Sequence, residues 1–210
     1  SGSLLKGNFN SNLGSIKVNF SSDFLRYNVF ILEEINLSQN ISSSEIRGEF
    51  LVNSLSVSDS LKFNKVHFVN SGSKGMLNST LTWDPESPAF SQITWRTSFM
   101  ENDQINFLLK PSFFSLNGLR WQIENESDIS LTPLDLNVTN FKLIRNEQQI
   151  KINGCLSKND FDKLKIDVNQ LDLTELSSVL GLPKKLGGFF SGWGMIANPY
   201  SNFTYLGDAT

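Results

Sequence analysis

The sequence predicts an all-β fold built from antiparallel hairpins, and three observations support this prediction. Apolar and polar residues alternate along most segments, which is the pattern of strands with one dry face and one wet face. Short clusters of Asn, Asp, Gly, Pro and charged residues separate these segments, as hairpin turns do. Only one segment, near residues 173–180, has apolar residues at helical spacing. The simplest arrangement is therefore a meander of hairpins with one short helix.

The alternating segments begin close to the N-terminus. In the first one Ile16, Val18 and Phe20 are separated by Lys17 and Asn19. The same alternation recurs at 93–99, 119–124, 134–139, 150–152 and 164–168. Each of these segments is expected to form a strand of an antiparallel sheet that is buried on one face.

The side on which the apolar residues lie changes within two of the segments. Val138 is followed by Phe141, and Val52 is followed by Leu55, so the apolar parity shifts by one residue in both places. One inserted residue has this effect, because it reverses the direction of every later side chain. The sequence thus predicts a β-bulge at each position.

Polar turns separate the expected strands. They are the segments "NSGSKG" at 70–75, "DPESP" at 84–88, "RNEQQ" at 145–149 and "SKND" at 157–160. Each combines residues that favour turns with a break in the apolar alternation.

The segment "LDLTELSSVLGLP" predicts a two-turn helix over about 173–180. Its helically spaced leucines are Leu173, Leu176 and Leu180. Asp172 is the expected N-cap, with Glu175 completing a capping box. Gly181 and Pro183 are expected to end the helix. A helix this short is unstable alone, so it should lie against the sheet, where it would close one end of an apolar interior.

A glycine-rich strand is expected after the helix, in "LGGFFSGWGMIANPY". Gly188, Gly192 and Gly194 share one parity, and Trp193 and Met195 share the other with Phe189. Glycine within a strand marks a bend or a close approach of two backbones, both of which a sharply curved sheet requires.

Composition places the 210-residue chain among globular proteins and excludes several functional classes. The net charge of −3 and the absence of a basic stripe argue against nucleic-acid binding. The single cysteine, Cys155, excludes an internal disulfide and a cysteine-based metal cluster, and we expect it to be an ordinary strand residue. No apolar run is long enough for a membrane-spanning helix. The 17 Phe against 3 Tyr favour a strongly apolar interior or groove.

Catalytic chemistry is not indicated by the sequence. The single histidine, His67, lies in a strand-like run without a second metal-ligating histidine or cysteine. The acidic residues near 124–128 and 160–167 fall in turns or at the polar positions of strands, where they favour solubility over paired-carboxylate catalysis. No nucleophile elbow, P-loop or HExxH motif occurs. We therefore expect a protein that is not an enzyme and has no cofactor or metal.

An extended apolar sheet face must be covered by something. A second sheet would give a closed sandwich, whereas a curved sheet with a partly open lining would accept acyl chains. The sequence pattern alone leaves both alternatives open.

The C-terminal half, from Leu119 onward, contains an ordered series of short motifs. A "WQI" strand is followed by "NFKL", "I-x-I-x-G-x-L-S", "D-x-L-x-I", "LDLTEL" and "L-x-G-x-F-x-G", in this order. This half resembles the C-terminal region of TamB-like proteins, which are relatives of the AsmA-type bridge proteins of diderm bacteria. The order and spacing carry the resemblance, which covers somewhat less than half the chain. Residues 1–118 agree only in their general pattern.

The resemblance implies an elongated antiparallel sheet of hairpins, curved lengthwise into a β-taco with an apolar groove. It implies a periplasmic segment, residues 1–210, of a longer protein that an N-terminal helix anchors in the inner membrane, with a division at 118/119 as an alternative. Its implied partners are phospholipid acyl chains and a BamA-like outer-membrane barrel of the TamA type. The implied groove-lining residues are Leu119, Trp121, Ile123, Leu134, Leu136, Val138, Ile150, Ile152, Leu164, Ile166 and Val168.

The function expected from this resemblance is non-catalytic shielding of lipid acyl chains on their way to the outer membrane, or assistance in outer-membrane protein assembly. The main alternative is a secreted or cell-surface β-sandwich that binds glycan or protein. A hydrolase on a β scaffold is the third hypothesis, and it requires carboxylates that converge in a pocket.

Overall fold

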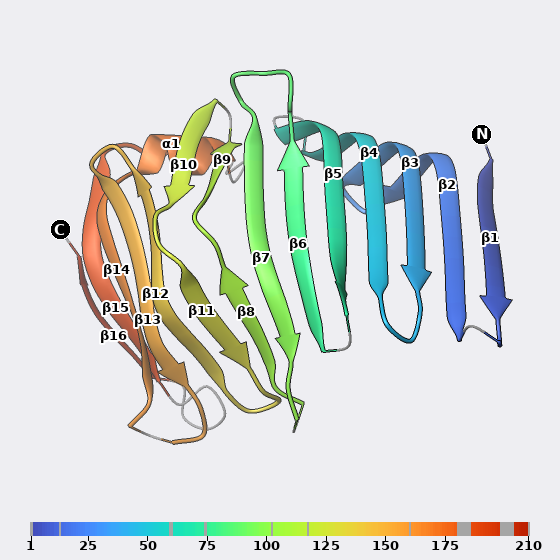
Figure 1. The fold of residues 1–210 in the computed structure, drawn as a ribbon. Coiled ribbons are helices and arrows are strands. Elements are labelled where there is room, and N and C mark those ends of the chain that lie inside the picture. The colour runs from blue at the N-terminus through green and yellow to red at the C-terminus, as the bar shows by residue number, and fades with distance from the viewer. Residues whose placement is uncertain are drawn as a thin grey trace. The chain divides into compact units, whose positions relative to one another are not determined.

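The fold is all-β, as predicted, and the described residues form one long antiparallel sheet of sixteen strands with one short helix (Figure 1). The structure is a computed structural model that describes residues 2–12, 14–58, 61–73, 75–101, 103–116, 118–159, 161–179, 186–197 and 204–209. Strands β1 to β8 and β11 to β16 follow one another in sequence order, and β9 and β10 pair outside this path. The strands therefore form one sheet, whereas the sandwich alternative predicted two.

The strands are β1 (Ser3–Asn10), β2 (Ser15–Tyr27), β3 (Phe30–Ile41), β4 (Ile46–Ser58), β5 (Leu61–Ser73), β6 (Met76–Trp83), β7 (Ser91–Phe99), β8 (Ile105–Leu109), β9 (Ser112–Leu116), β10 (Leu119–Ile123), β11 (Ser127–Leu131), β12 (Leu136–Arg145), β13 (Gln148–Leu156), β14 (Lys163–Asp172), β15 (Phe189–Ala197) and β16 (Thr204–Ala209). The helix is α1 (Leu173–Val179). The turns expected at 84–88 and 157–160 separate consecutive strands. The turn expected at 145–149 is shorter, because only Asn146 and Glu147 lie between β12 and β13, and Asn146 has the positive φ that a tight turn requires. The turn expected at 70–75 begins later than predicted, because β5 continues to Ser73.

The chain forms two compact units. The first comprises Ser1–Thr94 and Phe114–Leu119, and the second comprises Trp95–Phe113 and Arg120–Thr210. The chain passes from the first unit to the second for the last time between Leu119 and Arg120, which is one residue after the alternative division at 118/119. Residues 95–113 belong to the second unit although they lie between the two parts of the first unit, and the sequence did not predict this.

In the first unit one face of the sheet is apolar. Directly opposed residues of neighbouring strands lie on the same face. The pairs Phe20–Leu37, Leu37–Phe50 and Phe50–Phe68 thus form a continuous row, which Leu81 extends to β6. A second row contains Ile35, Val52 and Val66, all of which are buried. We call this surface the apolar face of the first unit.

A bend crosses the first unit at a fixed place in neighbouring strands. Asp23, Glu34, Asn53 and Lys65 are opposed to one another in register, and the pairing on both sides of them continues without a shift. Glu34 and Lys65 have positive φ angles of 53° and 49°. We call these four residues the bend row. Beyond it the strands curl over, as the upper ends of β3 to β5 in Figure 1 show.

The bend directs apolar residues on both of its sides toward one cluster. Ile35, Val52, Val66 and Trp83 form the buried cluster. Leu32 and Leu55, on the other side of the bend row, pack against it together with Phe63, whose ring meets Trp83 edge-on at 5.6 Å. The change of apolar parity between Val52 and Leu55 is real, but the bulge predicted to cause it is absent. No residue is inserted there, because the neighbouring strands change parity together.

The second unit contains the bulge that the sequence predicted at Val138. The pairing of β12 with β13 shifts between Val138 and Phe141, so two residues of β12 oppose Asn153 alone. A similar shift separates Val168 from Leu171 where β14 pairs with β15. Asn140 and Gln170, the residues with positive φ at these bulges, give the strands their local curvature.

The N-cap of helix α1 is as predicted, but the predicted capping box does not form, because the backbone N–H of Asp172 donates to Gln148 Oε1 and the Glu175 carboxylate accepts from Arg145 and Gln148 instead. Asp172 Oδ1 accepts hydrogen bonds from the backbone N–H groups of Thr174 (2.8 Å) and Glu175 (3.3 Å), which is N-capping. The expected helix end at Leu180, Gly181 and Pro183 lies outside the described residues.

Gly192 and Gly194 of β15 lie on the same face as the apolar residues of β14, because they oppose Val168 and Ile166. A Cβ at Gly192 would lie 2.5 Å from the carbonyl oxygen of Asp208, so the close backbone approach predicted for this strand is present. Trp193 opposes Asp167 and lies on the opposite face. Gly188 precedes the strand and has a φ of 91°.

Candidate functional site

The central residues of the predicted groove lining share one face of the second unit. Ile152 opposes Ile166, and Ile150 opposes Val168. Gly154 links Leu164 on one side to Val138 on the other. The polar residues Lys151, Asn153 and Lys165 alternate with them and occupy the other face. We call the first surface the apolar face of the second unit.

The predicted lining residues differ in exposure. Trp121, Ile123, Val138 and Leu164 are buried. Leu119, Leu136, Ile150, Ile152, Ile166 and Val168 are half-buried. Ile123 joins the same face because it opposes Leu143, which in turn opposes Ile150. Leu119 belongs to the first unit and is separate from the other ten.

Leu134 does not lie on a strand, contrary to the prediction. It is 44% exposed and lies in the turn before β12. Thr132 Oγ1 accepts hydrogen bonds from the backbone N–H groups of Leu134 (3.2 Å) and Asp135 (2.9 Å) and thereby stabilises this turn. The strand β12 begins at Leu136, but the apolar alternation starts two residues earlier, at Leu134, so the predicted strand was too long.

One end of the apolar face of the second unit is closed by α1. Arg145 and Gln148, the terminal paired residues of β12 and β13, project from this face. Glu175 of α1 accepts a hydrogen bond from the Arg145 guanidinium and another from Gln148 Nε2 (3.3 Å). Gln148 Oε1 accepts the backbone N–H of Asp172 (3.1 Å). The helix thus lies over the strand ends, where the sequence analysis expected it.

Trp121 packs beside this polar network. The Arg145 guanidinium lies 6.0 Å from the centre of its ring, within the range of a cation–π contact. Sequence reasoning missed Arg145 and Gln148. Their signal was available, because both occupy apolar parity positions at strand ends, where a polar residue needs a partner.

The apolar face of the first unit was not among the predicted site residues, because the family resemblance covers the other half of the chain. Its buried cluster contains one polar atom, Trp83 Nε1, for which the described residues provide no hydrogen-bond partner. The period-two alternation of 16–20, extended to 50–52 and 66–68, was the sequence signal for this second face.

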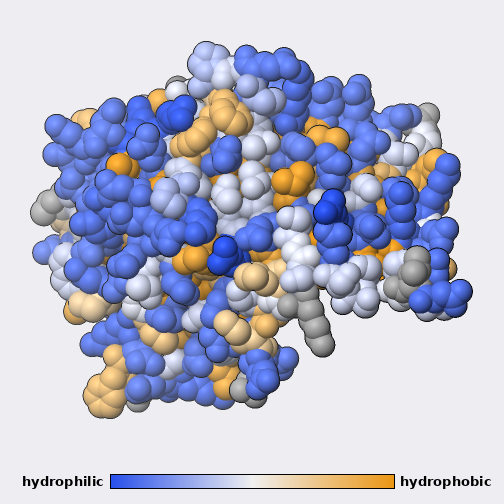
Figure 2. All heavy atoms as spheres, viewed as in Figure 1, coloured by the Kyte–Doolittle hydropathy of each residue, from blue (hydrophilic) through white to orange (hydrophobic). Residues whose placement is uncertain are grey.

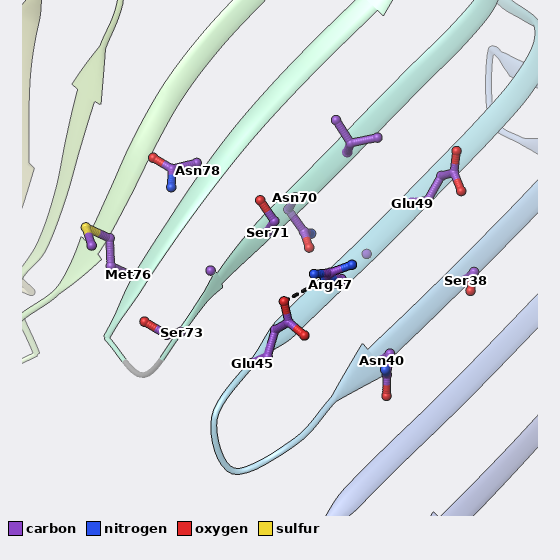
Figure 3. Close-up of a pocket in the computed structure, with 13 residues that line it drawn as sticks. Ser38, Asn40, Glu45, Arg47, Glu49, Asn70, Ser71, Ser73, Met76 and Asn78 are labelled. Atoms are coloured by element: carbon purple, nitrogen blue, oxygen red, sulfur yellow. Dashed lines mark hydrogen bonds and ion pairs between the residues drawn. The ribbon is translucent and has the colours of Figure 1, made fainter.

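Two hollows lie on the polar side of the first unit. The larger encloses about 780 Å³, and its lining includes Ser38, Asn40, Glu49, Ser71 and Asn78, which lie opposite one another on neighbouring strands. Figure 3 shows these side chains, together with the ion pair between Arg47 and Glu45. The smaller hollow, of about 420 Å³, includes Lys6, Asn19 and Leu51. Figure 2 shows one side of the molecule as mainly hydrophilic, with small separate apolar patches.

The groups considered for catalysis are occupied by ordinary surface interactions. His67 Nε2 lies 2.8 Å from Glu49 Oε1 on the polar side of the first unit. Glu124 and Glu126 form ion pairs with Lys142 and Lys110, and Asp162 accepts a hydrogen bond from Ser157. Within the described part of the chain, no group of three His, Cys, Asp or Glu side chains is arranged to hold a metal ion.

Cys155 lies in β13 and is half-buried, as expected for a strand residue. Burial raises the pKa of its thiol, and the negative charges of Asp162 and Asp135 raise this pKa further. A thiol with a raised pKa is a poor nucleophile near neutral pH.

Comparison with known proteins gives no assignment, because no family model, no curated protein and no solved structure matches the chain. Among the described residues, no helix is long and apolar enough to cross a membrane.

Proposed function

We propose that this chain is a segment of a TamB-like bridge protein whose apolar face shields acyl chains, without catalysing a reaction. The observation that carries the proposal is the apolar face of the second unit. There Ile150, Ile152, Ile166 and Val168 lie side by side on two neighbouring strands, β13 and β14, and all four remain half-buried. Half-buried aliphatic side chains leave apolar area that a further apolar group can cover.

The physical mechanism is desolvation. Covering apolar surface contributes about 0.8 kcal/mol for each CH₂ group removed from water. A row of aliphatic side chains offers this gain at successive positions, so an acyl chain can move along it without a large change in free energy. No polar side chain lies among these four residues in the two rows that they form.

Residues of β15 continue the apolar rows. Gly192 and Gly194 oppose Val168 and Ile166, and the ring of Phe190 reaches over Gly192, where an added Cβ would lie 3.3 Å from Phe190 Cζ. An aromatic side chain therefore borders the rows of β13 and β14 at this strand.

In this proposal the segment works in the periplasm, as part of a longer protein anchored in the inner membrane. Phospholipid acyl chains are its cargo, and a BamA-like barrel of the TamA type is its outer-membrane partner. Apolar faces of nascent outer-membrane strands are the second cargo that the same surface suits. No cofactor is required, because the chemistry consists only of burial.

Lipid co-purification tests the proposal. The chain is expressed in the periplasm of a diderm bacterium and purified without detergent, and bound phospholipid is measured by mass spectrometry. Wild-type protein is expected to retain phospholipid. Ile152→Asp should lose most of it, because a carboxylate in the apolar row must be desolvated by each acyl chain that covers it.

Lys151→Asp is the matched control, since Lys151 neighbours Ile152 but occupies the polar face. It should retain lipid at the wild-type level, and circular dichroism should show the same strand content in both variants. Absence of phospholipid from folded wild-type protein would contradict the proposal, as would equal loss in both variants.

A further inference from the structure

The polar end of the apolar face of the second unit holds a carboxylate between two donors. Glu175 Oε2 accepts hydrogen bonds from Arg145 Nη1 and from Gln148 Nε2 (3.3 Å). Gln148 is buried, and its Oε1 accepts the backbone N–H of Asp172, so the amide turns its N–H group toward Glu175. The two donors therefore form a preorganised site for an anionic oxygen.

This site continues directly into apolar surface. Arg145 and Gln148 oppose each other at the strand ends, and Ile150 and Ile152 follow on the same face of β13. A chain that starts at the donors and runs along β13 to Gly154 would extend for about 20 Å, at about 3.4 Å per residue. An acyl chain in one leaflet of a bilayer spans about 15 Å, so it fits on this face.

The carboxylate that occupies the site comes from a separate short element. Glu175 belongs to α1, a seven-residue helix that is too short to be stable without its contacts to the sheet. The side chains of Arg145 and Glu175 are 15% and 26% exposed, so solvent reaches the ion pair. Another anion can replace the Glu175 carboxylate at Arg145, because Glu175 then moves into water and no charge is left buried without a partner.

The neighbouring side chains leave the two donors to an anion. The ring of Trp121, which is buried, lies 6.0 Å from the Arg145 guanidinium and limits its movement. The Asp172 carboxylate lies at the same end of the sheet, but its Oδ1 accepts from the backbone N–H groups of Thr174 and Glu175. Capping of the helix thus uses a different carboxylate from the one at Arg145.

We propose that Arg145 and Gln148 bind the anionic head group of an amphiphile whose acyl chain lies on the apolar face of the second unit, and that Glu175 occupies this site until the amphiphile binds. The Glu175 carboxylate then takes the position of a phosphate or of a fatty-acid carboxylate. A guanidinium suits both groups, because its N–H donors form charge-assisted hydrogen bonds with their oxygens. The inference rests on the proposed function, since it assigns the head group of the ligand whose acyl chain that function places on this face.

Ligands with the same acyl chain and different head groups test the proposal. Lauroyl lysophosphatidate and monolauroylglycerol differ by one phosphate group, and laurate carries a carboxylate. Isothermal titration calorimetry of the lipid-free 210-residue chain, below the critical micelle concentrations, should give dissociation constants about threefold lower for the anionic ligands than for monolauroylglycerol. Glu175→Gln removes the competing carboxylate. It should lower the dissociation constants of the anionic ligands about tenfold and leave that of monolauroylglycerol unchanged.

Two further variants serve as controls. Arg145→Gln combined with Glu175→Gln replaces both charges with amides, so the variant has no unpaired charge at this site. It should bind lauroyl lysophosphatidate and monolauroylglycerol equally. Glu124→Gln removes a carboxylate from the ion pair with Lys142 on the polar face, and it should leave every dissociation constant unchanged.

The outcomes separate this proposal from the proposed function. A preference for anionic ligands that Glu175→Gln increases and the double variant abolishes supports the proposal. If the preference concerns laurate alone or lauroyl lysophosphatidate alone, it also identifies the anion. Equal binding of the charged and neutral ligands by both wild-type protein and Glu175→Gln overturns the proposal and leaves acyl-chain binding intact. Failure of all three ligands to bind overturns both.

Discussion

The two units of the molecule bend their strands in different ways. In the first unit the four residues of the bend row lie opposite one another, and the register is the same on both sides of the bend. In the second unit each bulge belongs to one strand, and the register shifts there. Both arrangements keep apolar residues on one face after the strand has turned.

The two kinds of bend differ in register, but near both of them a side chain of a neighbouring strand or turn accepts a backbone N–H group. At the bulges of the second unit a side chain of the neighbouring strand accepts the N–H group that the ladder leaves free. Asn153 Oδ1 accepts from Asn140 (3.2 Å), and Ser191 Oγ accepts from Gln170 (2.9 Å). In the first unit Asp84, which has a φ of 51°, likewise accepts the backbone N–H of Asn64 (3.3 Å) through Oδ1, together with Asn64 Nδ2 (2.9 Å). A parity slip in a sequence therefore indicates a turn of the strand, but not which of the two mechanisms produces it.

The largest expected effect concerns the cluster that the bend row creates. Val52 is 1% exposed, and Val52→Asp places a carboxylate there without a partner. We expect a loss of about 3–5 kcal/mol in the free energy of unfolding. Urea denaturation followed by tryptophan fluorescence measures it, since Trp83 belongs to the same cluster.

Leu51→Asp provides the comparison for this variant. Leu51 is the preceding residue on the polar side, where it opposes His67. The same carboxylate there should change the free energy of unfolding by no more than about 0.5 kcal/mol. Equal losses in the two variants would show that the faces of the first unit are assigned incorrectly.

The second unit depends instead on the polar network that holds α1. The side chains of Arg145 and Glu175 are 15% and 26% exposed. Glu175→Ala leaves the guanidinium without its carboxylate and should cost about 1–3 kcal/mol in the free energy of unfolding. Asp167→Ala removes the exposed pair with Lys165 and should cost at most about 1 kcal/mol. Thermal denaturation of both variants ranks the two pairs, and a larger loss for Asp167→Ala would be inconsistent with a helix held by Glu175.

Glycine substitutions distinguish the two kinds of bend. Glu34 has a φ of 53°, a conformation that costs a residue with a Cβ about 1–2 kcal/mol. Glu34→Gly should therefore raise the free energy of unfolding by about 0.5–1 kcal/mol, after the greater flexibility of glycine in the unfolded chain is included. Asn140→Gly should gain less, since asparagine tolerates this conformation better.

Glu33→Gly is the control for the first bend, because Glu33 is adjacent and has no positive φ. It should lower the free energy of unfolding by about 0.5–1 kcal/mol. Urea denaturation of the three variants measures the differences, and destabilisation by Glu34→Gly would mean that the bend row stores no backbone strain.

The smallest effect is at Cys155 of β13, which follows Gly154, the residue opposite Val138 at the bulge of β12. Burial and the charges of Asp162 and Asp135 hold its pKa above the usual range. Little thiolate is present below that raised pKa, so alkylation by iodoacetamide at mildly alkaline pH should be slower than that of an exposed thiol. Asp162→Asn should lower the pKa and speed the reaction, whereas Asp167→Asn should leave the rate unchanged. A rate that Asp162→Asn does not increase would contradict the assigned cause.

The elements that depend on local pattern could be predicted from the sequence. The alternation at 150–152 and 164–168 identified β13 and β14, and Asp172 identified the start of α1. Features that depend on pairing between distant residues could not be predicted. The bend row is defined by the register of Glu34 against Asn53 and Lys65, and the closed end of the second unit joins Arg145 to Glu175, thirty residues later in the chain.

Turn residues that mimic a strand pattern gave the clearest error. Leu134 continued the alternation of Leu136 and Val138, but the hydroxyl of Thr132 captures the backbone N–H groups of the turn before pairing begins. The groove-lining role of the other residues stays a prediction, because it concerns a ligand and not the position of a side chain.

The most direct test of lipid binding compares the two faces of one strand. A photo-reactive phenylalanine analogue is placed at Ile152 or at Lys151, neighbours in β13 whose side chains lie on opposite faces. The protein is then irradiated with radiolabelled phospholipid vesicles and separated by gel electrophoresis. The proposed function predicts labelled protein from position 152 and none above background from position 151. Equal labelling at both positions, or none at position 152, would contradict it.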